Sequence, residues 1–91
     1  MMKVVNKRFQ SYDVYIGRGS IWGNPFIIGP DGTRAQVIAK YEVYARNNKT
    51  IMKNLPTLKD KVLGCFCAPL PCHGDVLIKL YDELIKKNSS L

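Results

Sequence analysis

Three cysteines and the chain's single histidine occupy one short segment, and their side chains are the first candidates for chemistry. Cys65, Cys67, Cys72 and His73 follow a C-x-C-x4-C-H spacing. Cys65 and Cys67 are two residues apart, so on an extended strand their side chains face the same way. Three thiolates and an imidazole suit tetrahedral Zn²⁺, although the spacing departs from the common C-x2-C pair. The cluster therefore predicts a zinc site as one alternative.

The same segment also permits two interpretations without a metal. Unpaired N–H groups at the start of a helix favour a thiolate, so Cys72 or Cys67 could be a nucleophile assisted by His73 and Asp75. In the other interpretation the cysteines are small buried side chains and Asp75 is an ordinary helix cap. These alternatives stay open at the level of the sequence.

A glycine-rich turn is the second candidate. The residues are Gly17, Arg18, Gly19 and Ser20. Glycines let the backbone approach an anion, Arg18 can bind it with two hydrogen bonds, and Ser20 offers a hydroxyl group. The turn does not match the G-x-G-x-x-G pattern of dinucleotide-binding proteins, so it does not by itself identify a ligand.

Two aromatic rings and an amide follow this turn. Trp22 and Phe26 could stack on a base, and Asn24 could form a hydrogen bond with it. The alternative is that both rings hold the loop on the core. The residue types alone do not separate these roles.

The charge balance points to an anionic partner. Lys and Arg number 14 against 7 Asp and Glu, which gives a net charge of +7. This favours a nucleotide, nucleic acid or acidic protein, unless the excess lysine only solvates the surface. An odd number of cysteines argues against a disulfide framework. Neither a signal segment nor a membrane span is apparent, so we expect a cytoplasmic protein with no membrane partner.

The residue pattern predicts alternating strands and helices. We expect strands over residues 3–9, 12–16 and 61–66, a loop over 17–32, and helices over 33–47, 50–55 and 74–87. Thr33 and Gln36 fit a capping box, Thr50 caps the second helix and Pro56 ends it. The fold class is α/β: a single domain over residues 1–91 with a βαβ core, in which a short, mostly parallel sheet of about three strands packs with two to three helices.

This topology predicts that the two candidate segments meet. The strands of a βαβ unit are parallel, so their carboxyl ends lie at one edge of the sheet, where ligands bind in open α/β folds. The glycine-rich turn follows the end of one strand at that edge, and the cysteine cluster follows the end of the other.

Five runs of the sequence resemble one family. They are YIGRGS (15–20), WGNPF (22–26), DGTR (31–34), LGCFC (63–67) and CHGDVL (72–77). Together they are similar to a family of phages, other viruses and prokaryotes known as domain of unknown function four-three-two-six, from about Val4 to Leu84. That family often has tryptophan where this chain has Phe66. The resemblance implies that the runs form one site, and it suggests a viral context in which the protein acts in the host cytoplasm. It supplies no activity.

Residues and resemblance together predict one site. Its ligand-binding residues are predicted to be Gly17, Arg18, Gly19, Ser20, Trp22, Asn24 and Arg34. The first hypothesis is a domain that binds a nucleotide or a nucleic-acid phosphate, with or without structural zinc. The second is a cysteine- and histidine-dependent transferase or hydrolase acting on a nucleotide-like substrate through Cys72, His73 and Asp75. The third is a non-catalytic viral interaction protein.

Overall fold

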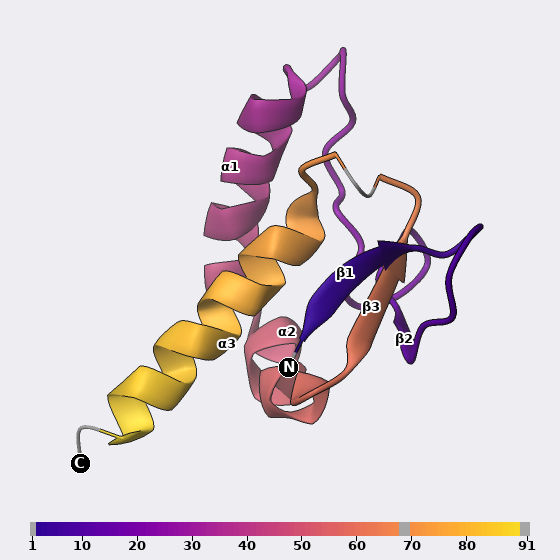
Figure 1. The fold of residues 1–91 in the computed structure, drawn as a ribbon. Helices are drawn as coiled ribbons and strands as arrows, with labels where there is room; N and C mark the ends of the chain where they lie inside the picture. The colour runs from indigo at the N-terminus through magenta and orange to yellow at the C-terminus, as the bar shows by residue number, and fades with distance from the viewer. Residues whose placement is uncertain (1, 68–69, 90–91) are drawn as a thin grey trace.

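The structure contains a parallel sheet, and the predicted meeting place of the two candidate segments lies at its edge. The computed structural model describes residues 2–67 and 70–89, and in this part of the chain it has a three-stranded sheet with the order β1-β3-β2 (Figure 1). The strands are β1 (Lys3–Asn6), β2 (Val14–Tyr15) and β3 (Val62–Cys65). Both outer strands run parallel to β3. The α/β class and the parallel strands are therefore confirmed.

The outer strands are shorter than the sequence predicts. Asn6 ends β1 because its side-chain oxygen accepts a hydrogen bond from the Arg8 N–H at 3.0 Å, and its carbonyl accepts from the Phe9 N–H at 3.1 Å. These bonds turn the chain where a strand was expected to continue to residue 9. Beyond β2, the Ile16 N–H still donates to the Gly64 carbonyl at 3.0 Å, which directs the following loop along the sheet edge.

The first two helices agree with the sequence except at one junction. Helix α1 (Arg34–Arg46) begins at the predicted capping box of Thr33 and Gln36. Helix α2 (Lys49–Asn54) begins one residue after Asn48, whose side chain accepts from the Ile51 N–H, so the predicted cap at Thr50 is wrong. The Asn48 side chain thus satisfies one of the N–H groups that have no partner within the first turn of α2.

Helix α2 ends at Asn54, one residue before the predicted end at Leu55, so the predicted end of this helix at Pro56 is confirmed to within one residue. The chain continues from α2 into a 3₁₀ helix, η1 (Leu55–Leu58), with Pro56 in its first turn. A proline is tolerated there because the missing N–H would have no partner in a first turn.

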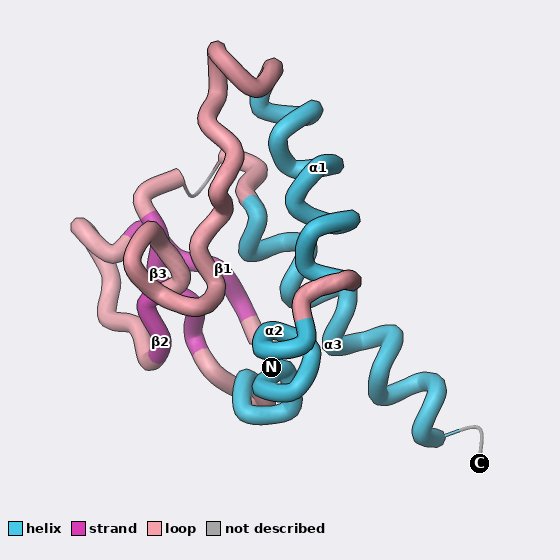
Figure 2. Tube along the Cα trace, turned by 180° about the vertical axis from the view of Figure 1, so that it is seen from behind, coloured by secondary structure: helices cyan, strands magenta, loops and turns pink. Residues whose placement is uncertain are grey.

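The helices pack together on one side of the sheet. Helix α3 (His73–Ser89) lies beside α1 (Figure 1), and the reverse view in Figure 2 shows the same layering. The core between the layers includes the fully buried residues Ile16, Tyr41, Leu55, Leu63 and Leu77. Among the described residues, no helix is long and apolar enough to cross a membrane.

The long loop over residues 17–32 is confirmed, and α1 holds it in place. The Tyr41 hydroxyl donates to the Trp22 carbonyl at 2.7 Å inside the core. At the far end of the loop, the Asp31 carboxylate accepts from the Ile27 N–H at 2.8 Å, and Gly29 pairs with Gly32 in an isolated bridge. The loop therefore has a defined shape without a strand of its own.

Candidate functional site

The two candidate segments line one pocket. A cavity of about 480 Å³ lies where β2 and β3 end, and its walls come from the loop after β2, the start of α1 and the segment between β3 and α3. From the predicted site it contains Gly17, Arg18, Asn24, Arg34, Cys65, Cys67, Cys72 and His73. The convergence expected from the parallel strands is therefore observed.

His73 joins the two segments at the pocket floor. It is the first residue of α3, and its Nε2 donates to the carbonyl oxygen of Ile16 at 2.6 Å. A carbonyl can only accept, so Nε2 carries the proton, and Nδ1 is the acceptor of the neutral ring. The edge of the imidazole also meets the Tyr41 ring at a centroid distance of 5.0 Å. The side chain therefore ties the end of β2 to the start of α3.

Because the His73 imidazole is buried, we expect the stability of the fold to depend on pH. Burial lowers the pKa of the His73 imidazole below its ordinary value, so the unfolded chain takes up this proton first as the pH falls. The stabilisation is complete above the unfolded pKa of about 6.5 and is lost as the pH falls from there through the folded pKa. Urea unfolding at a series of pH values measures the free energy of unfolding. Across this window, that free energy should change less with pH in His73→Gln than in the unaltered protein. Equal slopes would contradict the prediction.

Cys72 and Asp75 cap α3. The Cys72 sulfur accepts from the Gly74 N–H at 3.3 Å, and the Asp75 carboxylate accepts from the Cys72 N–H at 3.1 Å. The Asp75 side chain bonds back to the residue before the helix, as in a capping box, whereas the thiol accepts from the second helical N–H instead of the third. The Cys65 and Cys72 sulfurs are 3.5 Å apart. Burial raises the pKa of the Cys72 thiol to about 12, so the thiol is protonated at neutral pH.

These contacts favour structural roles for Cys72 and Asp75. A protonated, buried thiol is a poor nucleophile, because the thiolate is the reactive form. The Asp75 carboxylate accepts a hydrogen bond from backbone, and its charge acts on the His73 imidazole only as a lesser influence that raises the pKa which burial lowers. The catalytic roles of Cys72, His73 and Asp75 stay predictions.

The zinc interpretation depends on the same side chains. Cys65 and Cys72 are adjacent, but the Cys65 sulfur also accepts from the Cys67 N–H at 3.4 Å, and the His73 Nε2 is engaged by Ile16. Among residues 2–67 and 70–89, no group of three or more His, Cys, Asp and Glu is placed to hold a metal ion. Zinc binding by Cys65, Cys67, Cys72 and His73 stays a prediction.

Two arginines reach the pocket from different parts of the chain. Arg34, the first residue of α1, donates from Nη1 to the Pro71 carbonyl at 3.1 Å and so spans the pocket wall. Arg18 is exposed and lines both this pocket and an adjoining hollow of about 290 Å³. An anion in the pocket would have two guanidinium groups among the residues that line it.

The glycine-rich turn is divided between the two hollows. Gly19 and Ser20 line the smaller one, and Gly19 has a positive φ of 91°, which a residue with a side chain adopts rarely. The Ser20 hydroxyl donates to the Gly17 carbonyl at 2.7 Å and accepts from the Trp22 N–H at 3.3 Å. The Ser20 hydroxyl, which was a predicted ligand contact, therefore stabilises the shape of the turn.

Trp22 is not brought to the pocket wall. Its side chain is only 5% exposed and belongs to the core cluster. Asn24 does line the pocket, although its amide donates to the Val37 carbonyl at 3.3 Å and accepts from the Phe26 N–H at 2.9 Å. The Trp22 indole therefore holds the loop on the core, as in the second of the two interpretations. Phe26, the other ring in the loop, lines the pocket.

Sequence reasoning missed several apolar residues of the pocket wall. They are Tyr15, Ile27, Ile28, Ile38 and Phe66. Local signals existed for some of them, because Phe66 lies between two candidate cysteines and Ile38 follows Arg34 by one helical turn. These side chains make the wall suitable for the flat face of a ligand.

The fold and the pocket together define a small α/β domain with a ligand-sized hollow at the carboxyl ends of parallel strands. The chain belongs to the family described as domain of unknown function (DUF4326), whose model matches residues 2–83. The family that the sequence motifs resemble is therefore confirmed.

Two viral relatives cover nearly the whole chain. One is an uncharacterized 12.4 kDa protein from the nrdA-td intergenic region of Enterobacteria phage T4, which is 34% identical over 91 residues, or 94% of this chain and 82% of the relative. The other is uncharacterized protein R718 of Acanthamoeba polyphaga mimivirus, which is 37% identical over 100 residues, or 90% of this chain and 75% of the relative. No solved structure matches the chain significantly.

Proposed function

We propose that the pocket binds a nucleotide. The observation that carries the proposal is that Arg18 and Arg34 share one cavity of about 480 Å³ with the Phe26 and Phe66 rings. This volume lies within the usual range for small-molecule sites, which combine an apolar wall with a few charged groups. A nucleotide needs both: an apolar face for the base and cations for the phosphate.

The arginines supply most of the attraction for phosphate in this proposal. A guanidinium group can form two parallel hydrogen bonds with phosphate oxygens and remains charged at every physiological pH. The first turn of α3 contributes less, because the Cys72 sulfur and the Asp75 carboxylate already accept two N–H groups there. The phosphate is therefore expected near the pocket mouth, between Arg18 and Arg34.

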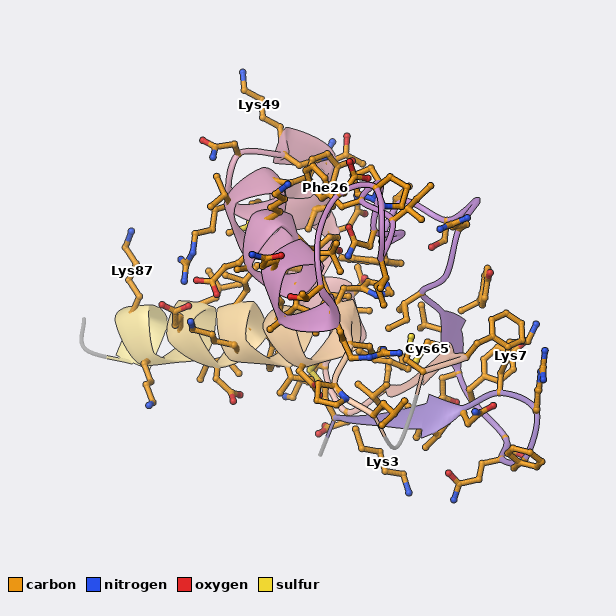
Figure 3. All side chains as sticks on the ribbon, turned by 90° about the horizontal axis from the view of Figure 1, so that it is seen from above. Lys3, Lys7, Phe26, Lys49, Cys65 and Lys87 are labelled. Carbon is orange, nitrogen blue, oxygen red and sulfur yellow. The ribbon has the colours of Figure 1, made fainter. Side chains whose placement is uncertain are left out.

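Nucleotide titration of the purified protein tests the proposal. We expect adenosine and guanosine mono-, di- and triphosphates to bind in calorimetric titrations, and the Arg18→Gln and Arg34→Gln variants to bind roughly tenfold more weakly or worse, since each loses a charged hydrogen bond to phosphate. Lys49→Gln is the matched control: it removes one positive charge from α2 at a residue that does not line the pocket, and Figure 3 shows the Lys49 side chain pointing outward, away from Cys65.

Two outcomes would contradict the nucleotide proposal, and the second is judged against the Lys49→Gln control. If none of the nucleotides binds at millimolar concentration, or if the two arginine variants bind as well as Lys49→Gln, the pocket is not a nucleotide site. Folding of each variant is checked by its thermal unfolding, because Arg34 also contacts the Pro71 carbonyl.

The thiol-dependent alternative has less support. A transferase or hydrolase acting through Cys72 needs a thiolate, whereas burial raises the pKa of this thiol to about 12. A binding function for the pocket needs no such ionisation, and it uses the exposed Arg18 instead.

A further inference from the structure

A cluster of aromatic rings and cations lies beside the pocket. The Lys7 ammonium is 4.9 Å from the ring centres of both Tyr15 and Phe66 and 5.9 Å from that of Tyr12. The Arg8 guanidinium is 5.2 Å from the Phe66 ring centre. We call these five residues the basic–aromatic surface. They come from the turn after β1, from the segment around β2 and from the end of β3.

The basic–aromatic surface is continuous with the pocket. Tyr15 and Phe66 belong to it and also line the cavity, so the surface begins where the cavity opens. The Phe66 side chain is 50% exposed and that of Tyr12 is 39% exposed. A ligand longer than one nucleotide that leaves the pocket on this side would therefore meet aromatic rings and positive charges.

The cations of this surface differ from Arg46 and Lys79 on the helices. Arg46 pairs with Glu42 at 2.9 Å and with Glu83 at 2.7 Å, and Lys79 pairs with Glu42 at 3.0 Å. Carboxylates thus compensate these helical charges. Lys7 and Arg8 lie over neutral rings instead, and their full charge is therefore available to an anion.

We propose that the basic–aromatic surface binds a single strand of nucleic acid whose terminal nucleotide enters the pocket; this inference rests on the proposed nucleotide site. Aromatic rings beside a basic groove are how proteins bind single strands, because each unpaired base offers a flat face for stacking. A duplex hides these faces between its own base pairs. DNA and RNA strands present the same chemistry to the surface, so both are used as probes.

Binding of short oligonucleotides tests the surface. Fluorescence anisotropy is measured with labelled oligothymidylate and oligouridylate of about eight nucleotides, a length within the range of known single-strand sites. The double variant Lys7→Gln/Arg8→Gln is expected to bind them roughly tenfold more weakly or worse, since it loses two charged contacts. Its affinity for a mononucleotide is expected to be unchanged, because neither residue lines the pocket.

Salt dependence and a matched double variant isolate the charge effect. The plot of log K against log salt concentration should lose about 1.4 from its slope in Lys7→Gln/Arg8→Gln, the value for two phosphate contacts with a single strand. The control Lys49→Gln/Lys53→Gln removes the same charge from α2 and should keep the slope and affinity of the unaltered protein.

Phe66 tests the stacking contribution. Phe66→Leu is expected to weaken oligonucleotide binding by roughly fivefold or more, the effect of losing one stacked base, whereas Phe66→Trp should retain it because the indole keeps a flat face. Thermal unfolding shows whether either variant is folded. If only Phe66→Leu fails to fold, two comparisons still test whether the surface binds a single strand. They are the comparison of Phe66→Trp with the unaltered protein and the comparison of the charge variants with their control.

Separate results overturn the two proposals. The strand proposal is wrong if oligonucleotides bind no more tightly than mononucleotides, if duplex DNA binds as tightly as the single strand, or if Lys7→Gln/Arg8→Gln behaves like Lys49→Gln/Lys53→Gln. Loss of mononucleotide binding in the arginine variants is measured independently, so the nucleotide site can be confirmed even when the strand proposal fails. A preference for DNA or for RNA identifies which strand the surface prefers, and either supports the proposal.

Discussion

Replacement of Trp22 by alanine is expected to lower the free energy of unfolding by about 3–5 kcal/mol, the usual cost of truncating a large buried aromatic side chain. The Trp22 side chain is 5% exposed and packs in the core cluster, so its removal leaves a cavity beneath the loop. The Trp22 carbonyl, which accepts from Tyr41, is retained in the variant. Urea unfolding followed by circular dichroism measures the change.

A surface residue provides the comparison for Trp22. Val43 is 64% exposed on α1, and Val43→Ala is expected to change the free energy of unfolding by no more than about 0.5 kcal/mol. Trp22→Phe should remain folded and bind nucleotides as the unaltered protein does, because the indole does not line the pocket. A stable Trp22→Ala that no longer binds nucleotides would show instead that the ring has the ligand role suggested by the sequence.

Gly74→Val is expected to lower the free energy of unfolding by about 3 kcal/mol, at the upper end for overpacking a core. A Cβ atom at Gly74 would lie 2.7 Å from Val4 Cγ2 and 2.8 Å from Ile16 Cδ1, with the Cys72 sulfur at 3.3 Å. The first turn of α3 would have to move away from the sheet. Nucleotide affinity should fall as well, because that movement displaces His73 in the pocket floor.

A double-mutant cycle separates this clash from a general loss of stability. Val4→Ala removes the methyl group that the new side chain meets, so Gly74→Val/Val4→Ala should be destabilised by at least about 0.5 kcal/mol less than the sum of the single variants. Strict additivity would mean that the cost of Gly74→Val arises elsewhere, for example at Cys72.

The order of elements and the place of the site follow from local patterns. The capping box of Thr33 and Gln36 is visible in the sequence because its two members are three residues apart, and it forms as expected. The apolar stripe of α3 is equally local. The meeting of the glycine-rich turn and the cysteine cluster needs only parallel strands, a rule of chain connection that requires no side-chain detail.

The roles of individual side chains do not follow from such patterns. Trp22 is a plausible stacking residue until the fold places it under the loop. Cys72 lies at a helix start, where a lowered thiol pKa is one alternative that the sequence allows, yet burial outweighs the backbone hydrogen bond from Gly74 and raises the pKa. Both outcomes depend on how deeply tertiary packing covers the side chain, which spacing along the chain does not reveal.

The brevity of β2 limits how this sheet could pair with a strand of another molecule. An outer strand with free N–H and C=O groups can recruit a strand from another molecule, but Val14–Tyr15 offers only two residues, too few for a lasting ladder. The opposite border of the sheet, β1, carries the exposed Lys3, whose charge opposes the approach of an identical strand. The domain can therefore display exposed rings near its pocket while its sheet borders resist intermolecular β-pairing.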